Sequence, residues 1–374
     1  MPAQYKIVLY SSAGVKQHEF VDFDFLTYTK RLHVPGNLRF RVGANSVAAQ
    51  YLTDRAQVEV YRRNTAVGLD WYVDYVGLVR DDVLEQDENG RDMVTALRCP
   101  GPLHLLEHRI IDFKSGVANK SAFTSVKGET LLKTLVTYNI TSSATTANGR
   151  NSDGTMASPV SITVQADGAA GNTIASWGCS FAPLLEELKA IAKVAGGDFD
   201  LVRASASSFV FNWYLGQRGS DLRTGASLVK FATKLGNMAK PKLTRERTRI
   251  RTKAIVAGAN SGSSREYTTR TGNGYASDNV IEAFVDARNL AAGSSLNAEG
   301  DKALADYKQQ DTLAFSAIQM PSCYYGKHYA IGGALGDLVN VEYRSYSAAH
   351  KITGVTVTFD EGGEKIDPET EFYA

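Results

Sequence analysis

The sequence predicts a mainly β fold with α+β insertions: two similar small β-barrels that carry inserted α/β subdomains. The composition is the first observation, since 18 Tyr and 15 Phe residues occur with many Val and Thr residues, which favour strands. The second is a stretch where Val339, Val341 and Tyr343 alternate with polar residues before a turn at 360–363. The third is that residues 54–97 repeat this order of features, which suggests a duplicated β module.

The order of these patterns along the chain predicts five segments. Pro100, Gly101 and Pro102 mark the end of the first strand-rich region, and helical patterns follow them. The expected segments are a first β-barrel at 1–99, an inserted α+β domain at 100–204, a second β-barrel built from 205–256 and 312–366, an inserted loop and helix subdomain at 257–311, and a C-terminal tail at 367–374. We expect the two barrels to superpose, because their strands and turns come in the same order.

Three helical segments are expected in the inserted α+β domain. Apolar residues recur on one stripe of 103–111 and of 129–138, and the strongest stripe follows Pro183 and stops at Gly196. Residues 140–170 are rich in Ser, Thr, Gly and Asn, which predicts a long exposed loop whose most mobile part is 142–158. In the later subdomain, the pattern of 298–308 is also helical.

Charge and cysteine content exclude several classes of protein. The formal net charge of +1 argues against a dedicated nucleic-acid binder, and no sequence-specific nucleic-acid binding is expected. The three cysteines are scattered, which fits a chain that folds in a reducing cytoplasm. The sequence has no run of about 18 apolar residues and no secretory leader pattern, so we expect neither membrane insertion nor Sec-dependent export.

One run of cations is conspicuous in this nearly neutral chain. Every second position of a predicted strand is basic, so five side chains would project from one face: Arg245, Arg247, Arg249, Arg251 and Lys253. Two interpretations remain open: a solvated edge strand whose charges block aggregation, or a row that meets an acidic surface on another subunit. Binding of single-stranded nucleic acid is a weaker third interpretation, because no aromatic residues interleave with the cations.

The stretch from His104 to His108 is the sharpest enzymatic signal. In inverted zinc peptidases, two histidines one helical turn apart bind the metal, and a glutamate just before the second histidine activates the metal-bound water. Glu107 has this position here. A third ligand would have to come from Glu186 or Glu187, whose neighbours do not match the expected ligand motif. The competing interpretation is an amphipathic helix that carries two of the six histidines on its polar side.

A glycine-rich stretch near the C-terminus has a structural interpretation. Gly332, Gly333 and Gly336 lead into a predicted strand and not into a helix, which favours a barrel turn over a phosphate-binding loop. Asp337 would stabilise this turn by accepting backbone hydrogen bonds. Elsewhere in the sequence, no nucleophile with a base and no pair of carboxylates can be identified.

Several stretches, taken in order, resemble the tail-hub proteins of long-tailed bacteriophages, the family related to the trimeric baseplate hub of contractile tails. The matching stretches are FLTYTKRLHVPGNLRFRV, GPLHLLEHRII, SFAPLLEELKAIAKVAGGDFDLV, KFATKLGNMAKPKLT, EAFVDARN, and YGKHYAIGGALGDLVNV with ITGVTVTF. Together they cover most of the chain in the family's order.

The resemblance implies a hub-like architecture and a structural role in the virion. Three subunits with two similar barrels each would form a ring that offers pseudo-sixfold symmetry to a hexameric tail tube. The implied place is the tail tip of a particle made in the host cytoplasm, and the implied partners are the distal tail protein hexamer, the tape-measure protein and tail fibres or receptor-binding proteins. No catalytic residue, cofactor or metal is expected. Many relatives continue into a lysin or receptor-binding extension, whereas this sequence stops at Ala374 soon after the second expected barrel, and this departure argues against an intrinsic cell-wall activity without excluding one.

Two other functions remain as alternatives. The first is a tail-associated zinc peptidase that uses His104 and His108. The second is a carbohydrate-binding β protein, which would require three tryptophans to be exposed together: Trp71, Trp177 and Trp213.

Overall fold

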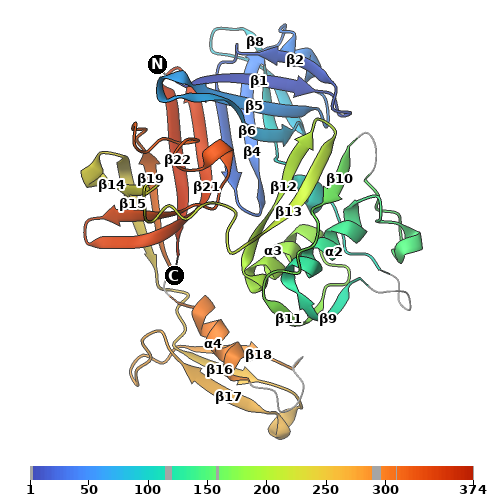
Figure 1. The fold of residues 1–374 in the computed structure, drawn as a ribbon, viewed down its shortest axis with the longest axis vertical. Helices are drawn as coiled ribbons and strands as arrows, with labels where there is room; N and C mark the ends of the chain where they lie inside the picture. Colours follow the sequence, from blue (N-terminus) through green and yellow to red (C-terminus); the bar gives the residue numbers. More distant parts are fainter. Residues whose placement is uncertain (1–2, 114–119, 157–159, 289–295, 309, 374) are drawn as a thin grey trace. The chain divides into compact units, whose positions relative to one another are not determined.

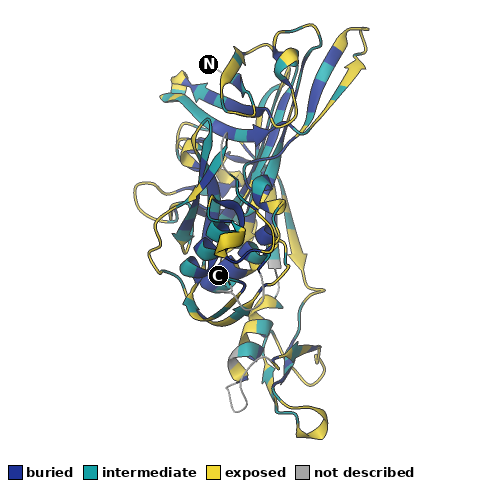
Figure 2. Ribbon diagram, turned by 90° about the vertical axis from the view of Figure 1, so that its right-hand side faces the viewer, coloured by how far each residue is buried: buried dark blue, intermediate teal, exposed yellow. Residues whose placement is uncertain are grey.

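The computed structural model describes residues 3–113, 120–156, 160–288, 296–308 and 310–373, and it divides into two compact units (Figure 1). Unit 1 consists of 1–241 and 314–374, and unit 2 consists of 242–313. Both are rich in strands, and many strands of unit 1 carry both buried and exposed residues (Figure 2). The loop and helix subdomain expected at 257–311 is wrong in this respect, because residues 267–271 and 282–286 form strands. No helix in the described part of the chain is long and apolar enough to cross a membrane.

A four-stranded antiparallel sheet forms from the N-terminal region of unit 1, in the order β2-β1-β5-β6. Its strands are β1 (Gln4–Tyr10), β2 (Lys16–Phe20), β5 (Gln57–Asn64) and β6 (Leu69–Leu78). Ile7 and Leu9 of β1 are completely buried, as are Val58 and Val60 of β5. These side chains recur at every second position, and the intervening Val8, Gln57 and Glu59 are buried as well, so both faces of these two strands are largely covered.

A ten-stranded sheet joins the two ends of the chain. Its main path runs β15-β19-β22-β21-β3-β4-β8-β7, and β20 and β14 branch from β21. The strands are β3 (Leu26–Arg31), β4 (Val34–Gly43), β7 (Asp81–Gln86), β8 (Asp92–Cys99), β14 (Lys230–Ala232), β15 (Met238–Glu246), β19 (Gln310–Ala317), β20 (Leu338–Tyr343), β21 (Tyr346–Asp360) and β22 (Gly363–Phe372). β15 leads into unit 2 and β19 leads out of it.

The long strand β21 makes this joining possible. Residues 350–360 of β21 pair with β22, while its other partners are β20, along 346–351, and β3, along 354–359. Strands of the two predicted barrels therefore share one sheet, and the division into two barrels stays a prediction. The expected C-terminal tail is wrong as far as residue 372, because β22 continues until Phe372 pairs with His350.

The inserted α+β region packs helices against short strands, and it extends past the expected bound of residue 204 because the strand at 208–215 pairs within it. Its helices are α1 (His104–Glu107), α2 (Gly128–Ile140) and α3 (Leu184–Ala195), and its strands are β9 (Ala122–Lys127), β10 (Ser161–Val164), β11 (Thr173–Gly178), β12 (Gly197–Ser205) and β13 (Ser208–Leu215). The predicted helix after Pro183 is confirmed, and it ends at Gly196 in the left-handed conformation. The predicted helix at 103–111 is wrong beyond Glu107, because Ile111 exchanges backbone hydrogen bonds with the segment that precedes α3.

The segment 140–156 is not the unpacked loop that its composition predicted. Arg150 is 4% exposed and donates to Asn139 Oδ1, to Ile110 O at 3.3 Å and to Ser152 O at 3.0 Å. Asp112 accepts hydrogen bonds from the backbone and hydroxyl of Ser152. One buried arginine thus anchors a segment that has few apolar residues, while residues 157 and 158 of the predicted mobile part lie outside the described residues.

Unit 2 is a three-stranded sheet with a helix on one face. Its elements are β16 (Lys253–Ala257), β17 (Tyr267–Thr271), β18 (Glu282–Asp286) and α4 (Asn297–Asp306), in the strand order β17-β16-β18. A small apolar cluster lies between sheet and helix: Ala254, Val256, Ala287, Leu296 and Leu304.

The basic run does not form one strand. β15 ends at Glu246, the chain turns where Ile250 N donates to Arg247 O at 3.1 Å, and β16 begins at Lys253. Five like charges at alternate positions of one strand would repel each other, and the turn separates them. The predicted single row is therefore wrong.

Close packing at Gly197 generates the first prediction. A Cβ added there would lie 2.4 Å from Trp213 Cζ2 and 2.4 Å from Tyr214 O. We expect Gly197→Ala to lower the free energy of unfolding by about 1–3 kcal/mol, because the strand pair must move apart. Gly178, at the end of β11, is the matched control, since a Cβ there meets no atom within 4 Å. Denaturant unfolding curves that match for the two variants would contradict the prediction.

Candidate functional site

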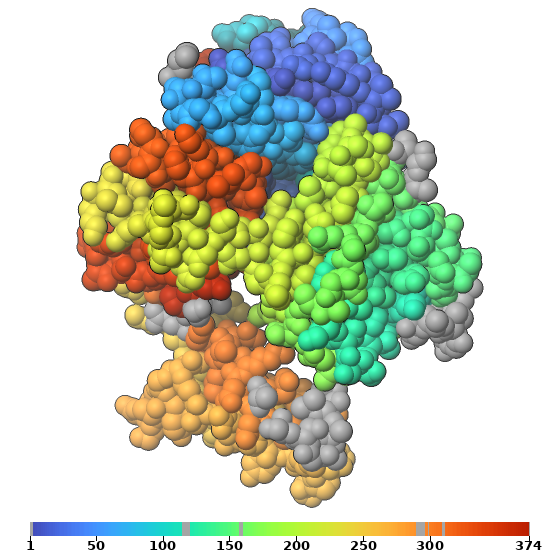
Figure 3. Space-filling model, in the orientation of Figure 1, coloured from blue at the N-terminus to red at the C-terminus, as the bar shows by residue number. Residues whose placement is uncertain are grey.

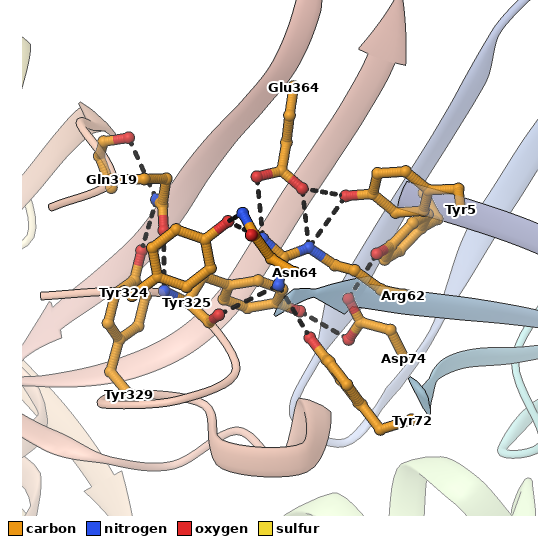
Figure 4. A network of polar contacts seen from close by, with 12 residues as sticks. Tyr5, Arg62, Asn64, Tyr72, Asp74, Gln319, Tyr324, Tyr325, Tyr329 and Glu364 are labelled. Carbon is orange, nitrogen blue, oxygen red and sulfur yellow. Dashed lines mark hydrogen bonds and ion pairs between the residues drawn. The ribbon is translucent and has the colours of Figure 1, made fainter. Parts of the chain in front are cut away.

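A buried ion pair between Arg62 and Glu364 lies at the centre of the polar contacts of unit 1. Arg62 follows Val58 and Val60 at alternate positions of β5, and its side chain is completely buried. Its Nε lies 2.7 Å from Glu364 Oε1 and its Nη2 lies 2.9 Å from Oε2, which makes the pair bidentate (Figure 4). Because Glu364 belongs to β22, the pair joins the four-stranded sheet to the ten-stranded sheet.

The remaining N–H groups of Arg62 also have acceptors. Nη1 donates to Tyr72 Oη at 3.3 Å and to Tyr325 O at 3.1 Å, and Nη2 donates to Tyr324 Oη at 3.1 Å. The rings of Tyr324 and Tyr325 each lie 5.2 Å from the guanidinium carbon. Tyr5 Oη donates to Glu364. We call these residues the Arg62 cluster: Tyr5, Arg62, Tyr72, Tyr324, Tyr325 and Glu364. Complete hydrogen bonding is the condition under which a buried ion pair can be stable.

A second buried acid, Asp74 of β6, holds the neighbouring segment. Its carboxylate accepts from Tyr28 Oη at 2.5 Å and from Tyr325 Oη at 2.8 Å, and it forms an ion pair with Lys30. Burial raises the pKa of Asp74, but Lys30 and the Tyr28 hydroxyl outweigh burial and hold the pKa below its usual value. Lys30 also donates to Gly333 O at 3.0 Å, so the glycine turn is held against β3.

A third buried acid joins the inserted region to the ten-stranded sheet. Asp198 of β12 lies 2.6 Å from Lys351 Nζ of β21 and 3.3 Å from His33 Nε2 of the β3–β4 turn. It also accepts from Arg218 N at 2.9 Å. Burial raises the pKa of Asp198, but the contacts with His33 and Lys351 outweigh burial and lower the pKa overall. Asp198 is therefore an ionised anchor.

A cavity of about 350 Å³ lies where these elements meet, between β6, the β3–β4 turn, β12 and the turn at 332–335. Figure 3 shows the N-terminal strands, the strands near residue 200 and the C-terminal strands side by side on this face of unit 1. Two of the acids that line the cavity are Glu59, 3.2 Å from Arg203, and Asp200, 2.7 Å from Arg218. The third is Asp74, beside Lys30. With each of these carboxylates beside a cation, the cavity does not present paired carboxylates for acid–base catalysis.

The geometry at His104 does not favour the zinc-peptidase interpretation. Glu107 Oε2 lies 2.6 Å from His104 Nδ1, and the Nε2 atoms of His104 and His108 lie 2.9 Å apart, within hydrogen-bonding distance of each other. Two acids and two arginines line the same hollow, Asp54, Asp81, Arg80 and Arg98, and Asp54 already pairs with Arg80 at 3.1 Å. No group of three metal-binding side chains occurs among the residues that the structure describes.

The expected third ligands have other partners. Glu187 accepts a hydrogen bond from Trp177 Nε1 at 3.0 Å, and Glu186 forms an ion pair with Lys189 at 2.7 Å. The carbohydrate interpretation fails on burial, because Trp213 is only 5% exposed and packs in the core of the inserted region.

The structural interpretation of the glycine-rich stretch is confirmed. The chain makes a tight turn at Ile331–Gly333, with Gly332 and Gly333 at positive φ, and enters β20 at Leu338. Asp337 accepts hydrogen bonds from Ser220 N at 2.7 Å and from Ala330 N at 2.6 Å. It thereby fixes both the turn and the segment that precedes β14.

The basic residues separate into two groups by exposure, since Arg251 and Lys253 are half-buried. Arg251 Nη1 donates to Ile250 O at 2.9 Å, and Lys253 lies 2.8 Å from Glu282, so both have partners within unit 2. Arg245, Arg247 and Arg249 are exposed. We call residues 245–249 the basic turn.

The sequence analysis missed the Arg62 cluster and Asp74. One signal was available for Arg62: it has the same phase along β5 as Val58 and Val60, so it had to point inward. Its partner Glu364 is some 300 residues away in the chain (|i−j| = 302), and no local pattern identifies it.

Comparison with known proteins places the chain in a family. The model of the Siphovirus ReqiPepy6 Gp37-like protein family matches residues 7–370, and the chain belongs to this family. No curated protein matches it.

Solved structures of phage tail proteins share the fold. The tail protein from Neisseria meningitidis MC58 aligns at a TM-score of 0.60 and 10% identity, covering 98% of this chain and 96% of that chain. The prophage MuSo2 43 kDa tail protein from Shewanella oneidensis aligns at 0.60 and 12%, covering 98% of each chain. Prophage tail protein gp18 from Listeria monocytogenes EGD-e aligns at 0.52 and 12%, covering 97% and 94%. The resemblance to phage tail proteins that the sequence indicated is confirmed at the level of family and fold.

The Arg62 cluster generates a stability prediction. We expect Glu364→Gln to lower the free energy of unfolding by about 3–5 kcal/mol, because the variant leaves the Arg62 charge buried without its counter-ion. Arg62→Ala should have a similar effect. Arg63→Ala is the matched control, since the neighbouring Arg63 makes its contact with Gln4 at the surface and its loss should change stability by less than about 1 kcal/mol. Equal chemical-denaturation midpoints for wild type and Glu364→Gln would contradict the role given to the cluster.

Asp198 generates a prediction about pH. Its folded pKa is lowered from an unfolded value of about 4, so the ionised carboxylate stabilises the fold above about pH 4, and this contribution is lost as the pH falls through the folded pKa. We expect Asp198→Asn to be less stable than wild type near neutral pH, with a difference that shrinks in acid. Thermal melting across this pH range measures the difference. Asp22→Asn, at an exposed position, is the control, and a difference independent of pH would refute the assignment.

Proposed function

We propose that this chain is a structural virion protein that forms the hub closing the tail tube at the tail tip. The observation that carries the proposal is the family match over residues 7–370, to which the tail-protein fold adds support by covering 98% of the chain. The dense ion pairing of unit 1 also supports a structural role, because the three acids that line its cavity, Glu59, Asp74 and Asp200, each pair with a cation of the same unit.

A trimer is the assembly that we propose for the hub. Each subunit would present two related strand-rich surfaces, one from the region of residues 54–97 and one from the region of 323–369, so that three subunits would offer six similar surfaces to a hexameric tube. The antiparallel β5–β6 pair and the β20–β21–β22 meander support this reading of the repeat.

The partners follow from a place at the end of the tube. We propose contacts with the distal tail protein hexamer, with the tape-measure protein inside the tube, and with tail fibres or receptor-binding proteins outside. The basic turn is proposed to lie at a subunit or tube contact and not along the DNA path. A conduit for a polyanion should avoid rings of cations, since each phosphate contact would add salt-dependent affinity and slow the sliding of DNA.

The assembly prediction is tested by mass. Native mass spectrometry of the purified protein should show a species at three times the 40.6 kDa chain mass, together with monomer at low concentration. A protein that stays monomeric at every concentration would contradict a self-assembling hub.

A further inference from the structure

One outer strand of the ten-stranded sheet, β7, is an open, acidic edge. Among the described strands, β7 pairs only with β8, so one side of its backbone lacks a strand partner. Asp81, Asp82 and Glu85 are exposed on it, and they flank Leu84, which is 67% exposed. An edge strand that combines charge with an exposed leucine is protected against non-specific pairing but still offers a specific contact.

Unit 2 carries a surface of complementary character. Helix α4 covers the sheet face that contains Ala254 and Val256. On the other face, Ile255 of β16 lies opposite Thr269 of β17 and Phe284 of β18. Phe284 is 63% exposed even though the Arg265 guanidinium carbon lies 5.6 Å from its ring centroid, so this face is largely uncovered in the described part of the unit.

The charges on this face are balanced, and the excess of cations lies in the basic turn. Lys253 shares this face with Ile255 but pairs with Glu282 at 2.8 Å, and Arg265 pairs with Asp286 at 2.6 Å. The basic turn, which holds Arg245, Arg247 and Arg249, precedes Lys253 in the chain. The apolar cluster under α4 is small for a unit of this size, so a partner on the uncovered face would add substantially to the apolar area removed from water.

We propose that the β7–β8 hairpin of one copy docks on the uncovered sheet face and basic turn of unit 2 in a neighbouring copy. The proposal rests on the proposed self-assembly and names the contact that would produce it. Charge complementarity favours a second copy of this chain as the partner. The total charge of the chain is nearly balanced, but the hairpin is acidic and the basic turn is cationic, so each surface complements the other surface on a neighbouring copy. A contact between different surfaces of identical subunits runs head to tail, and it closes into a ring when the rotation between subunits permits.

Charge reversal on each side tests the contact. The variant Asp82→Lys/Glu85→Lys should raise the dissociation constant of the oligomer at least tenfold in sedimentation velocity at moderate salt. Arg247→Glu/Arg249→Glu should do the same from the other side. Combining all four substitutions in one chain should restore much of the assembly, since the paired charges are then exchanged and not lost.

Matched controls separate the contact from the proposed function. Asp22→Lys/Glu371→Lys reverses two exposed acids elsewhere in unit 1 and should assemble as wild type does. Circular dichroism confirms that each variant is folded. If wild type assembles and the hairpin variant assembles equally well, or if the fourfold variant is not rescued, the docking proposal is wrong while the hub survives. If wild type itself never assembles, the proposed function fails first.

Discussion

Placing Arg62 and Glu364 together inside unit 1 removes two charges from water, which is unfavourable unless every hydrogen-bonding group is satisfied. This condition constrains the surrounding structure. Tyr72 must approach from β6, Tyr324 and Tyr325 from the segment before β20, and Glu364 from β22. Four parts of the chain thus have to be folded before the guanidinium is satisfied, and this requirement couples the N-terminal sheet to the C-terminal strands.

The other buried acids extend the same coupling outward. Asp74 holds the glycine turn through Lys30, and Asp198 holds the inserted α+β region through Lys351. Each acid contacts residues distant in the sequence, so the arrangement of unit 1 is fixed by a few directional contacts in addition to its apolar core. Such rigidity suits a protein whose proposed task is to keep its shape under the load of a tail.

Local sequence patterns predicted much of the secondary structure but little of the pairing between strands and side chains that are distant in the sequence. Alternation identified β5 and β20, and the stripe after Pro183 identified α3, because each depends only on the phase of neighbouring residues. The prediction of one basic strand was wrong because the alternation of residues does not take account of repulsion between the like charges. This repulsion favours a turn at residues 247–252. Composition also misjudged 140–156, since one buried arginine can order a polar segment. The pairing of β21 with β3, and of Arg62 with Glu364, spans most of the chain and leaves no local trace.

A cryo-EM reconstruction of the tail tip in assembled particles would test the central claim, that this chain is a self-assembled structural hub, most directly. The account predicts three copies around the tube axis, with the β7–β8 hairpin of each copy within ion-pairing distance of the basic turn of the next and no ring of arginines facing the lumen. Density for the chain elsewhere in the particle, a different copy number at the tip, or Arg247 and Arg249 lining the channel would contradict it.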